Sequence, residues 1–110
     1  MLQIVNREYC KKLLVMLPGQ VHPEQYHQTK EETFYVVAGE VVISLDGIER
    51  TCRAGDVVVV ERGTRHMMRA ITAVVIEEIS TTHVVQDSYY SDPTITASTD
   101  RKTLVTHWMY

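Results

Sequence analysis

Four of the five glycines stand at positions 39, 47, 55 and 63, so a glycine recurs every eight residues. The segments between them are rich in Val, Ile, Thr and Tyr, as in VVISL at 41–45 and VVVV at 57–60. Short β-prone segments separated by regular turn residues are typical of a β-sandwich or a β-barrel. No segment keeps a helical period. The spacing therefore predicts an all-β fold.

Turn residues place the individual strands. Asp46-Gly47 follows VVISL and favours a two-residue hairpin with the segment IERTC. A strand at 13–17 is expected to end at Pro18-Gly19 because proline has no amide hydrogen for a ladder, and a loop is expected to run from there to about Gln25. The other expected strands start at Glu32 and His66 or cover residues 73–80 and 103–108.

Length and charge limit the classes of function. A chain of 110 residues forms one domain, 1–110, with a single core. The formal net charge of −3 comes without a cluster of Lys and Arg, which argues against a nucleic-acid partner. Apolar runs are far shorter than the roughly 20 residues that cross a bilayer, so no membrane partner is expected. The first residues lack an export signal, and we therefore expect a cytoplasmic protein whose two cysteines, Cys10 and Cys52, are reduced.

Four polar side chains have spacings that suit a metal site. Gln25 and His27 are two residues apart, so on a strand they leave the same face. Glu32 begins the next strand-like run, and His66 stands at the start of another. Two imidazole nitrogens with one or two oxygens suit Zn, Mn, Fe, Co or Ni better than Ca or Mg. The pattern indicates a divalent transition metal as cofactor.

The segments that carry these residues resemble the two motifs of the cupin superfamily. Residues 19–39 fit the first motif, G-x(5)-H-x-H-x(4)-E-x(6)-G, with Gln25 in place of its first histidine. Residues 55–70 resemble the second motif, G-x(5)-P-x-G-x(2)-H-x(3)-N, with Glu61 in the proline position and Ala70 in the asparagine position. The resemblance implies a single small cupin domain, a double-stranded antiparallel β-helix of jelly-roll type.

The same resemblance implies that His27, Glu32 and His66 are metal ligands. Gln25 is the departure, since an amide oxygen binds metal more weakly than an imidazole. A Gln, His, Glu, His set is nevertheless similar to the zinc site of phosphomannose isomerases, which are also cupins, so Gln25 is kept as a weak fourth ligand. The alternative is a hydrogen-bonded polar network without a metal.

The end of the chain adds a second resemblance. IEEISTTHVVQDSYYSDPTI, followed by DRKTLVTHW, looks like the end of the cupin domain attached to some bacterial sialic acid synthases, and faintly like D-lyxose isomerases. In the isomerase comparison Glu78 is the candidate acid/base, because aldose to ketose conversion moves a proton between adjacent carbons. Glu77 must point to the other face of its strand. The alternative is one solvated and one salt-bridged carboxylate.

Two classes of function follow, with a third behind them. The first is a metal-dependent enzyme acting on a sugar or sugar acid, an isomerase or epimerase. The second is a non-catalytic sugar-binding or regulatory module, and the third is a metal-dependent dioxygenase. The partner is expected to be a small molecule, with a second copy of the chain forming a homodimer through residues 2–5.

The inward face of the expected barrel can also be read from residue parity. Phe34, Val36 and Ala38 share parity with Glu32, and Met68 shares it with His66. If the ligands face inward, these apolar side chains are expected to line the pocket. His22 matches no ligand position of either motif and is interpreted as a packing or surface residue.

Overall fold

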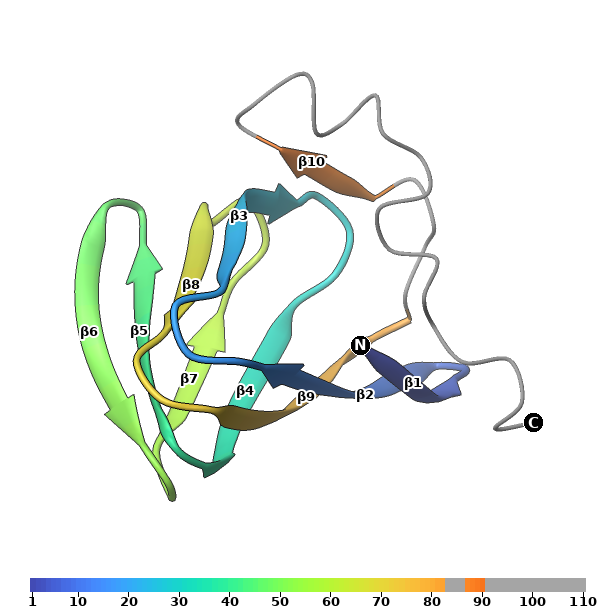
Figure 1. The fold of residues 1–110 in the computed structure, drawn as a ribbon. Coiled ribbons are helices and arrows are strands. Elements are labelled where there is room, and N and C mark those ends of the chain that lie inside the picture. Colours follow the sequence, from blue (N-terminus) through green and yellow to red (C-terminus); the bar gives the residue numbers. More distant parts are fainter. Residues whose placement is uncertain (83–86, 91–110) are drawn as a thin grey trace.

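The computed structural model describes residues 1–82 and 87–90. These residues form two five-stranded antiparallel sheets (Figure 1). The strand order is β1-β2-β9-β4-β7 in the first sheet and β10-β3-β8-β5-β6 in the second. The strands are β1 (Leu2–Asn6), β2 (Tyr9–Met16), β3 (Val21–His27), β4 (Glu32–Ala38), β5 (Glu40–Leu45), β6 (Ile48–Arg53), β7 (Val57–Val60), β8 (His66–Ala70), β9 (Val74–Thr81) and β10 (Ser88–Tyr90). The predicted all-β fold of two antiparallel sheets is confirmed.

Consecutive strands mostly cross between the sheets rather than pair with each other. In Figure 1, β6 lies at the left of the view and β1 at the right, with the remaining strands curving between them. Strand β4 pairs with β7 and β9, while β8 pairs with β3 and β5. Each sheet therefore takes strands from both halves of the chain, which brings distant segments together. Within residues 1–82 and 87–90, no helix is long and apolar enough to cross a membrane.

The glycine period marks turns, as predicted. The expected hairpin connects β5 and β6, where Asp46 has a φ of 48° and Gly47 a φ of 83°, both in the left-handed region. Gly39 serves close packing as well as a turn: a Cβ atom there would lie 2.1 Å from the carbonyl oxygen of Ala73. A larger residue at position 39 would therefore push the β4–β5 corner away from the segment before β9.

Two details of the first half differ from the sequence-based expectation. The loop expected up to Gln25 is wrong, because β3 already begins at Val21. A bulge between His22 and Gln25 shifts the β3–β8 register, so these two residues face Met68 and His66 on the same side. Ala38 is exposed and does not line the interior, because a second bulge after Val36 shifts the β4–β9 register.

The end of the chain is described only in part. The stretch from Asp87 contributes β10, a short strand that pairs with β3. The strand expected at 103–108 lies outside the described residues. The segment 2–5 forms most of β1, which pairs with β2 of its own chain and stands at the edge of its sheet.

The interior changes from apolar to polar along several strands. Inward side chains pass from Met16 and Leu14 to Lys12 on β2, from Val74 and Ile76 to Glu78 on β9, from Val36 and Phe34 to Glu32 on β4, and from Ala70 and Met68 to His66 on β8. The apolar half forms the hydrophobic core. The polar half collects buried ionisable groups at one end of the barrel, where burial without partners is costly.

Candidate metal centre

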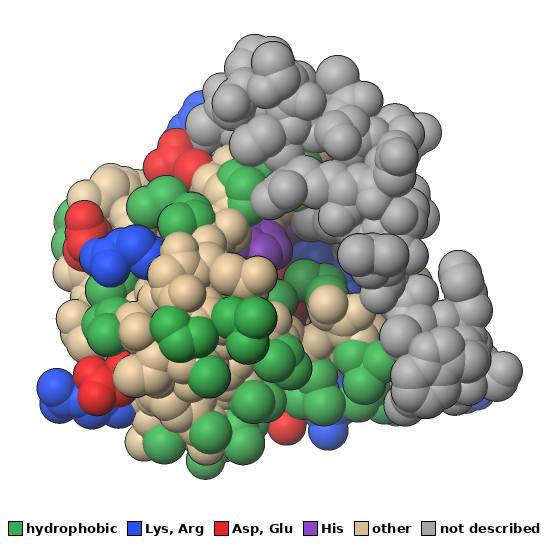
Figure 2. Space-filling view, viewed as in Figure 1, with side chains coloured by type: hydrophobic (Ala, Val, Ile, Leu, Met, Phe, Trp, Pro, Cys, Tyr) green, Lys and Arg blue, Asp and Glu red, His purple; other side chains and the backbone are tan. Residues whose placement is uncertain are grey.

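Three side chains from three strands converge at the polar end of the barrel. His27 ends β3, Glu32 begins β4 and His66 begins β8, and all three are buried. One ligand atom from each residue lies within 4.8 Å of the others. Glu32 Oε1 lies 2.7 Å from His27 Nε2 and 3.4 Å from His66 Nε2. A histidine side chain is visible in the hollow at the centre of Figure 2.

Backbone carbonyl groups orient both imidazole rings. His27 Nδ1 lies 3.2 Å from the carbonyl oxygen of Asp87, and His66 Nδ1 lies 3.2 Å from that of Thr64. A carbonyl oxygen can only accept, so each Nδ1 carries the donated hydrogen. In the neutral ring, Nε2 then presents its lone pair, which is the arrangement found in metal-ligating histidines.

The facing atoms suit a cation. With Nδ1 as donor, both Nε2 atoms and the Glu32 carboxylate are electron-pair donors directed at one place. Glu32 Oε1 is buried and lies 2.7 Å from His27 Nε2, a distance at which the two atoms share either a hydrogen bond or a metal ion. Three donors turned toward each other repel unless a positive charge lies between them. The set of two imidazoles and one carboxylate fits Zn, Mn, Fe, Co or Ni.

Gln25 is the fourth residue that the sequence singled out. It is buried on β3 and lies directly opposite His66 in the β3–β8 register. Its Nε2 lies 3.0 Å from His22 Nδ1. An amide nitrogen only donates, so Gln25 Nε2 is the donor in this contact. The amide oxygen of Gln25 is therefore turned away from the His22 ring. The bulge explains this contact, since residues three apart would face opposite sides of a regular strand.

Glu78 occupies the neighbouring part of the same interior. It is buried on β9, while Glu77 points outward, as predicted from strand parity, and pairs with Lys11 at 3.7 Å. Burial, followed by the nearby charge of Glu32, raises the pKa of Glu78 to about 7. This carboxyl group is therefore able to hold or release a proton near neutral pH.

A buried lysine links the two carboxylates. Lys30 Nζ lies 3.7 Å from Glu32 Oε2 and 3.7 Å from Glu78 Oε2. Burial would raise the pKa of Glu32, but the close approach of His27 and the charge of Lys30 outweigh it and lower that pKa. Glu32 is therefore ionised, as a metal ligand must be.

Lys12 adds a second buried ammonium group. It lies opposite Glu78 in the β2–β9 register, and burial followed by the charge of Lys30 lowers its pKa. Sequence reasoning did not single out Lys12, yet its parity with Leu14 and Met16 predicts an inward side chain. No comparable pattern points to Lys30, which lies in the β3–β4 loop.

Asp87 fixes the loop that carries Lys30. Its carboxylate accepts the backbone N–H groups of Gln28 and Thr29 at 3.0 Å and that of Lys30 at 3.2 Å. Burial opposes ionisation, but these hydrogen bonds outweigh it and lower the pKa of Asp87. The side chain thus joins the segment before β10 to the loop between His27 and Glu32.

Replacing Asp87 with alanine is expected to cost about 2 kcal/mol of unfolding free energy at pH 7, because three backbone donors lose their acceptor. Urea denaturation measures this. The matched control is Asp56→Ala, which removes one exposed hydrogen bond to the Arg53 N–H and should cost less than about 1 kcal/mol. Since the pKa of Asp87 is lowered, its contribution is present above the ordinary value of 3.8 and lost as the pH falls through the folded-state pKa. Equal stability of Asp87→Ala and wild type at pH 7 would contradict the assignment.

Both cysteines are buried and free, as expected from the sequence. Burial raises the pKa of both thiols, which disfavours the reactive thiolate. Cys52 packs in the hydrophobic core, whereas Cys10 lies on the inward face of β2. Neither belongs to the three-residue cluster.

Comparison with known families identifies one match that covers most of the described chain. The family model Cupin_2, described as a cupin domain, matches residues 12–80. These residues include both motifs, the three converging side chains and Glu78. Protein SchB from Streptomyces halstedii is 34% identical over 55 residues, which are 50% of this chain and 40% of SchB.

Solved structures with the same fold include KdgF from Halomonas sp., with a TM-score of 0.71 and 19% identity over 74% of this chain and 76% of KdgF. TT1209 from Thermus thermophilus gives a TM-score of 0.68 and 20% identity, covering 74% of this chain and 80% of TT1209. An oxalate oxidase gives a TM-score of 0.64 and 21% identity, covering 68% of this chain and 42% of that protein. These TM-scores establish the double-stranded β-helix fold. Because the sequence identities are low, the chemistry has to be argued from the site of this chain.

Proposed function

Since the chain belongs to the Cupin_2 family of cupin domains, we propose that it is a small metal-binding protein that acts on a sugar or sugar acid. The observation that carries this proposal is the convergence of His27 Nε2, Glu32 Oε1 and His66 Nε2 within 4.8 Å. Cupins commonly bind divalent metals and small-molecule ligands, and the buried donor set suits a transition metal.

The proposed ligands differ in strength. His27, Glu32 and His66 would hold the metal, with Gln25 as a weak fourth ligand through its amide oxygen. The hydrogen bonds of the two Nδ1 atoms to backbone carbonyl groups keep the rings in the binding orientation. When bound, the metal would act as a Lewis acid and polarise two adjacent oxygens of a polyhydroxylated or carboxylated molecule.

Glu78 is the proposed acid/base. In an isomerase its Oε2 would take a proton from one carbon and return it to the next, while a second proton passes from the hydroxyl to the adjacent carbonyl oxygen; in an epimerase it would take the proton from the single carbon whose configuration changes. The pKa of about 7 supports this role, since the carboxyl group exchanges protons readily at neutral pH. Lys30, 3.7 Å from Glu78 Oε2, would hold the carboxylate in place and favour its charged form.

The experiment that tests this function uses metal-loaded wild-type protein in deuterated solvent. A panel of aldoses, ketoses and sugar acids is added, and loss of a carbon-bound proton signal is followed by NMR. Exchange with one member of the panel supports an enzymatic function. If no panel member exchanges or turns over, but one raises the melting temperature, the chain is a sugar-binding module instead. The ion pair between Lys30 and Glu78 is compatible with that second function too, because it also fits a purely structural carboxylate.

We also propose that the protein forms a homodimer. Among the described strands, β1 pairs with β2 and stands at the edge of its sheet, and an edge strand is a common site of pairing with a second copy. The outward face of the same sheet adds exposed apolar side chains. They include Val15, Tyr35, Val57, Val59 and Ile79.

Light scattering at micromolar concentration is expected to give about twice the chain mass of 12.6 kDa. Ile4→Pro should shift the protein to monomer, because proline removes a backbone donor from the edge strand. Ile4 lies at the β1 bulge and has no register partner on β2, so the β1–β2 pairing should survive this change. Ile4→Val is the matched control and should remain dimeric. A monomeric wild type would contradict the dimer, and a dimeric Ile4→Pro would exclude the β1 edge as its interface.

A further inference from the structure

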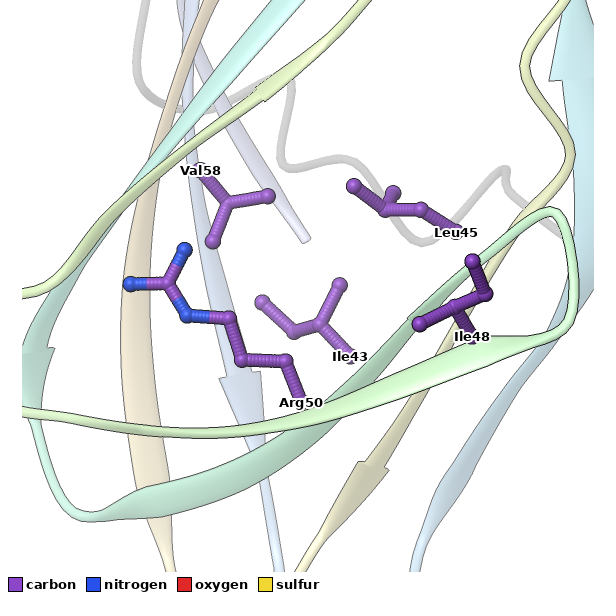
Figure 3. A pocket seen from close by; sticks show the side chains of 5 residues that line it. All are labelled: Ile43, Leu45, Ile48, Arg50 and Val58. Carbon is purple, nitrogen blue, oxygen red and sulfur yellow. The ribbon is translucent and has the colours of Figure 1, made fainter.

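An apolar pocket lies between the edge strands of the two sheets, beside the proposed metal centre. It has a volume of about 240 Å³ and is lined by Ile43, Leu45, Ile48, Arg50 and Val58 (Figure 3). The first four belong to the β5–β6 hairpin of one sheet, and Val58 belongs to β7 of the other. Four of the five lining residues are aliphatic, and the fifth carries a permanent positive charge.

The shape of the β5–β6 hairpin explains why the pocket exists. Ile48, Arg50 and Cys52 share one face of β6, yet Cys52 is fully buried while Ile48 is 76% exposed. Strand β6 therefore moves away from the other sheet as it approaches its turn. The inward side chains Ile43 and Val58 close the bottom of the opening, since both are buried in the core. The floor is thus fixed by packing and the rim is open to solvent.

Arg50 differs from the neighbouring arginine on its strand. Arg53 pairs with Glu40 at 3.5 Å. Arg50 forms no salt bridge with any residue in 1–82 or 87–90, and no acidic residue lines the pocket. Figure 3 shows its guanidinium group directed along the pocket wall toward Val58. A planar cation beside an apolar cavity is complementary to a carboxylate that carries an apolar group.

We propose that this pocket binds the apolar part of a small carboxylic acid whose carboxylate pairs with Arg50. A cavity of about 150 Å³ is enough to hold benzene, so 240 Å³ accommodates a ring with a short acid-bearing arm. A polyhydroxylated molecule is a poor match, because hydroxyl groups against Ile43, Leu45 and Val58 would lose hydrogen bonds to water.

The pocket is separate from the metal ligands but adjacent to them. None of its five lining residues is a proposed ligand, so binding does not depend on a metal or on the proposed function. Leu45 lies directly opposite His66 in the β5–β8 register. Leu45 is therefore the lining residue that links the pocket to a proposed ligand, since the two residues are neighbours across the β5–β8 pair.

The probe for this site is 3-phenylpropionate, with 3-phenylpropan-1-ol as its neutral counterpart. Both are titrated into metal-free protein with labelled methyl groups and followed by NMR. The acid is expected to bind with a Kd of about 1 mM and to shift the methyl signals of Ile43, Ile48 and Val58. The alcohol should bind about tenfold more weakly, because it cannot form the charge-assisted pair with Arg50.

Three variants separate the contributions. Arg50→Gln should lower the affinity for the acid about tenfold and leave the affinity for the alcohol unchanged. Ile48→Ser should lower both affinities. Arg53→Gln is the matched control and should change neither. Absence of binding would overturn the proposal. The proposal would also be overturned if the two probes bound with equal affinity, if Arg50→Gln bound the acid as tightly as wild type, or if the shifted methyl signals lay outside the pocket. Binding of the acid by His66→Ala would show that the pocket works even if the metal proposal fails.

Discussion

Replacing Glu78 with glutamine is expected to lower proton exchange between a carbon of the substrate and deuterated solvent by a factor of about 10²–10⁴. The amide has almost the same size as the carboxyl group but cannot accept the proton. Metal binding should be retained, because Glu78 is not among the three converging side chains. The measurement is NMR-detected exchange in metal-loaded protein with the substrate that the panel identifies.

The matched control is Glu77→Gln, which changes the neighbouring carboxylate on the outward face of β9. It should exchange at the wild-type rate. Exchange by Glu78→Gln at that same rate would exclude Glu78 as the base.

Urea denaturation of metal-free protein tests whether the pKa of Glu78 is raised in the folded state. The pKa of Glu78 is raised, so its stabilising contribution is greatest below the ordinary value of 4.5 and is lost as the pH rises through about 7. The stability of wild type relative to Glu78→Gln should therefore fall between these two pH values.

Removing either imidazole is expected to lower metal affinity by more than about 100-fold, a larger loss than a supporting residue outside the ligand set usually causes. His27→Ala and His66→Ala each delete a buried nitrogen donor that a backbone carbonyl orients. Gln25→Ala should cost about tenfold or less, since a neutral amide oxygen is the weakest donor of the set. Zinc titration into metal-free protein, followed by calorimetry with a competing chelator, measures all three.

His22→Ala is the matched control for this series. It deletes an imidazole on the same strand that contacts Gln25 and is not a proposed ligand. Its effect should be no larger than that of Gln25→Ala. Zinc affinity unchanged in both His27→Ala and His66→Ala would show that the site is elsewhere.

Local chemistry and spacing predict much of this fold. The glycine period indicates turns because each turn needs a left-handed backbone, and Asp46-Gly47 has the expected angles. Strand parity separates Glu77 from Glu78 because successive side chains alternate. The cupin motifs single out His27, Glu32 and His66, which the structure brings together, since each motif fixes the position of these residues relative to the start or end of a strand.

The remainder depends on contacts that spacing does not encode. The β3 bulge turns His22 toward Gln25, and the β4 bulge turns Ala38 outward; an extra residue in a strand reverses every parity argument beyond it. Lys30 and Asp87 meet across 57 residues of sequence. Only the folded chain shows that Asp87 holds the loop carrying Lys30, and that Lys30 lies between two carboxylates.

We propose that His27, Glu32 and His66 hold one divalent transition metal, and metal analysis of the purified protein tests this proposal. Metal-free wild-type protein is incubated with a Zn, Mn, Fe, Co or Ni salt and freed of excess ions. Its metal content is then measured by elemental mass spectrometry. We expect about one ion per chain for at least one of these metals and almost none in His66→Ala. Wild-type protein that retains none of the five metals, or His66→Ala that retains as much as wild type, would contradict it.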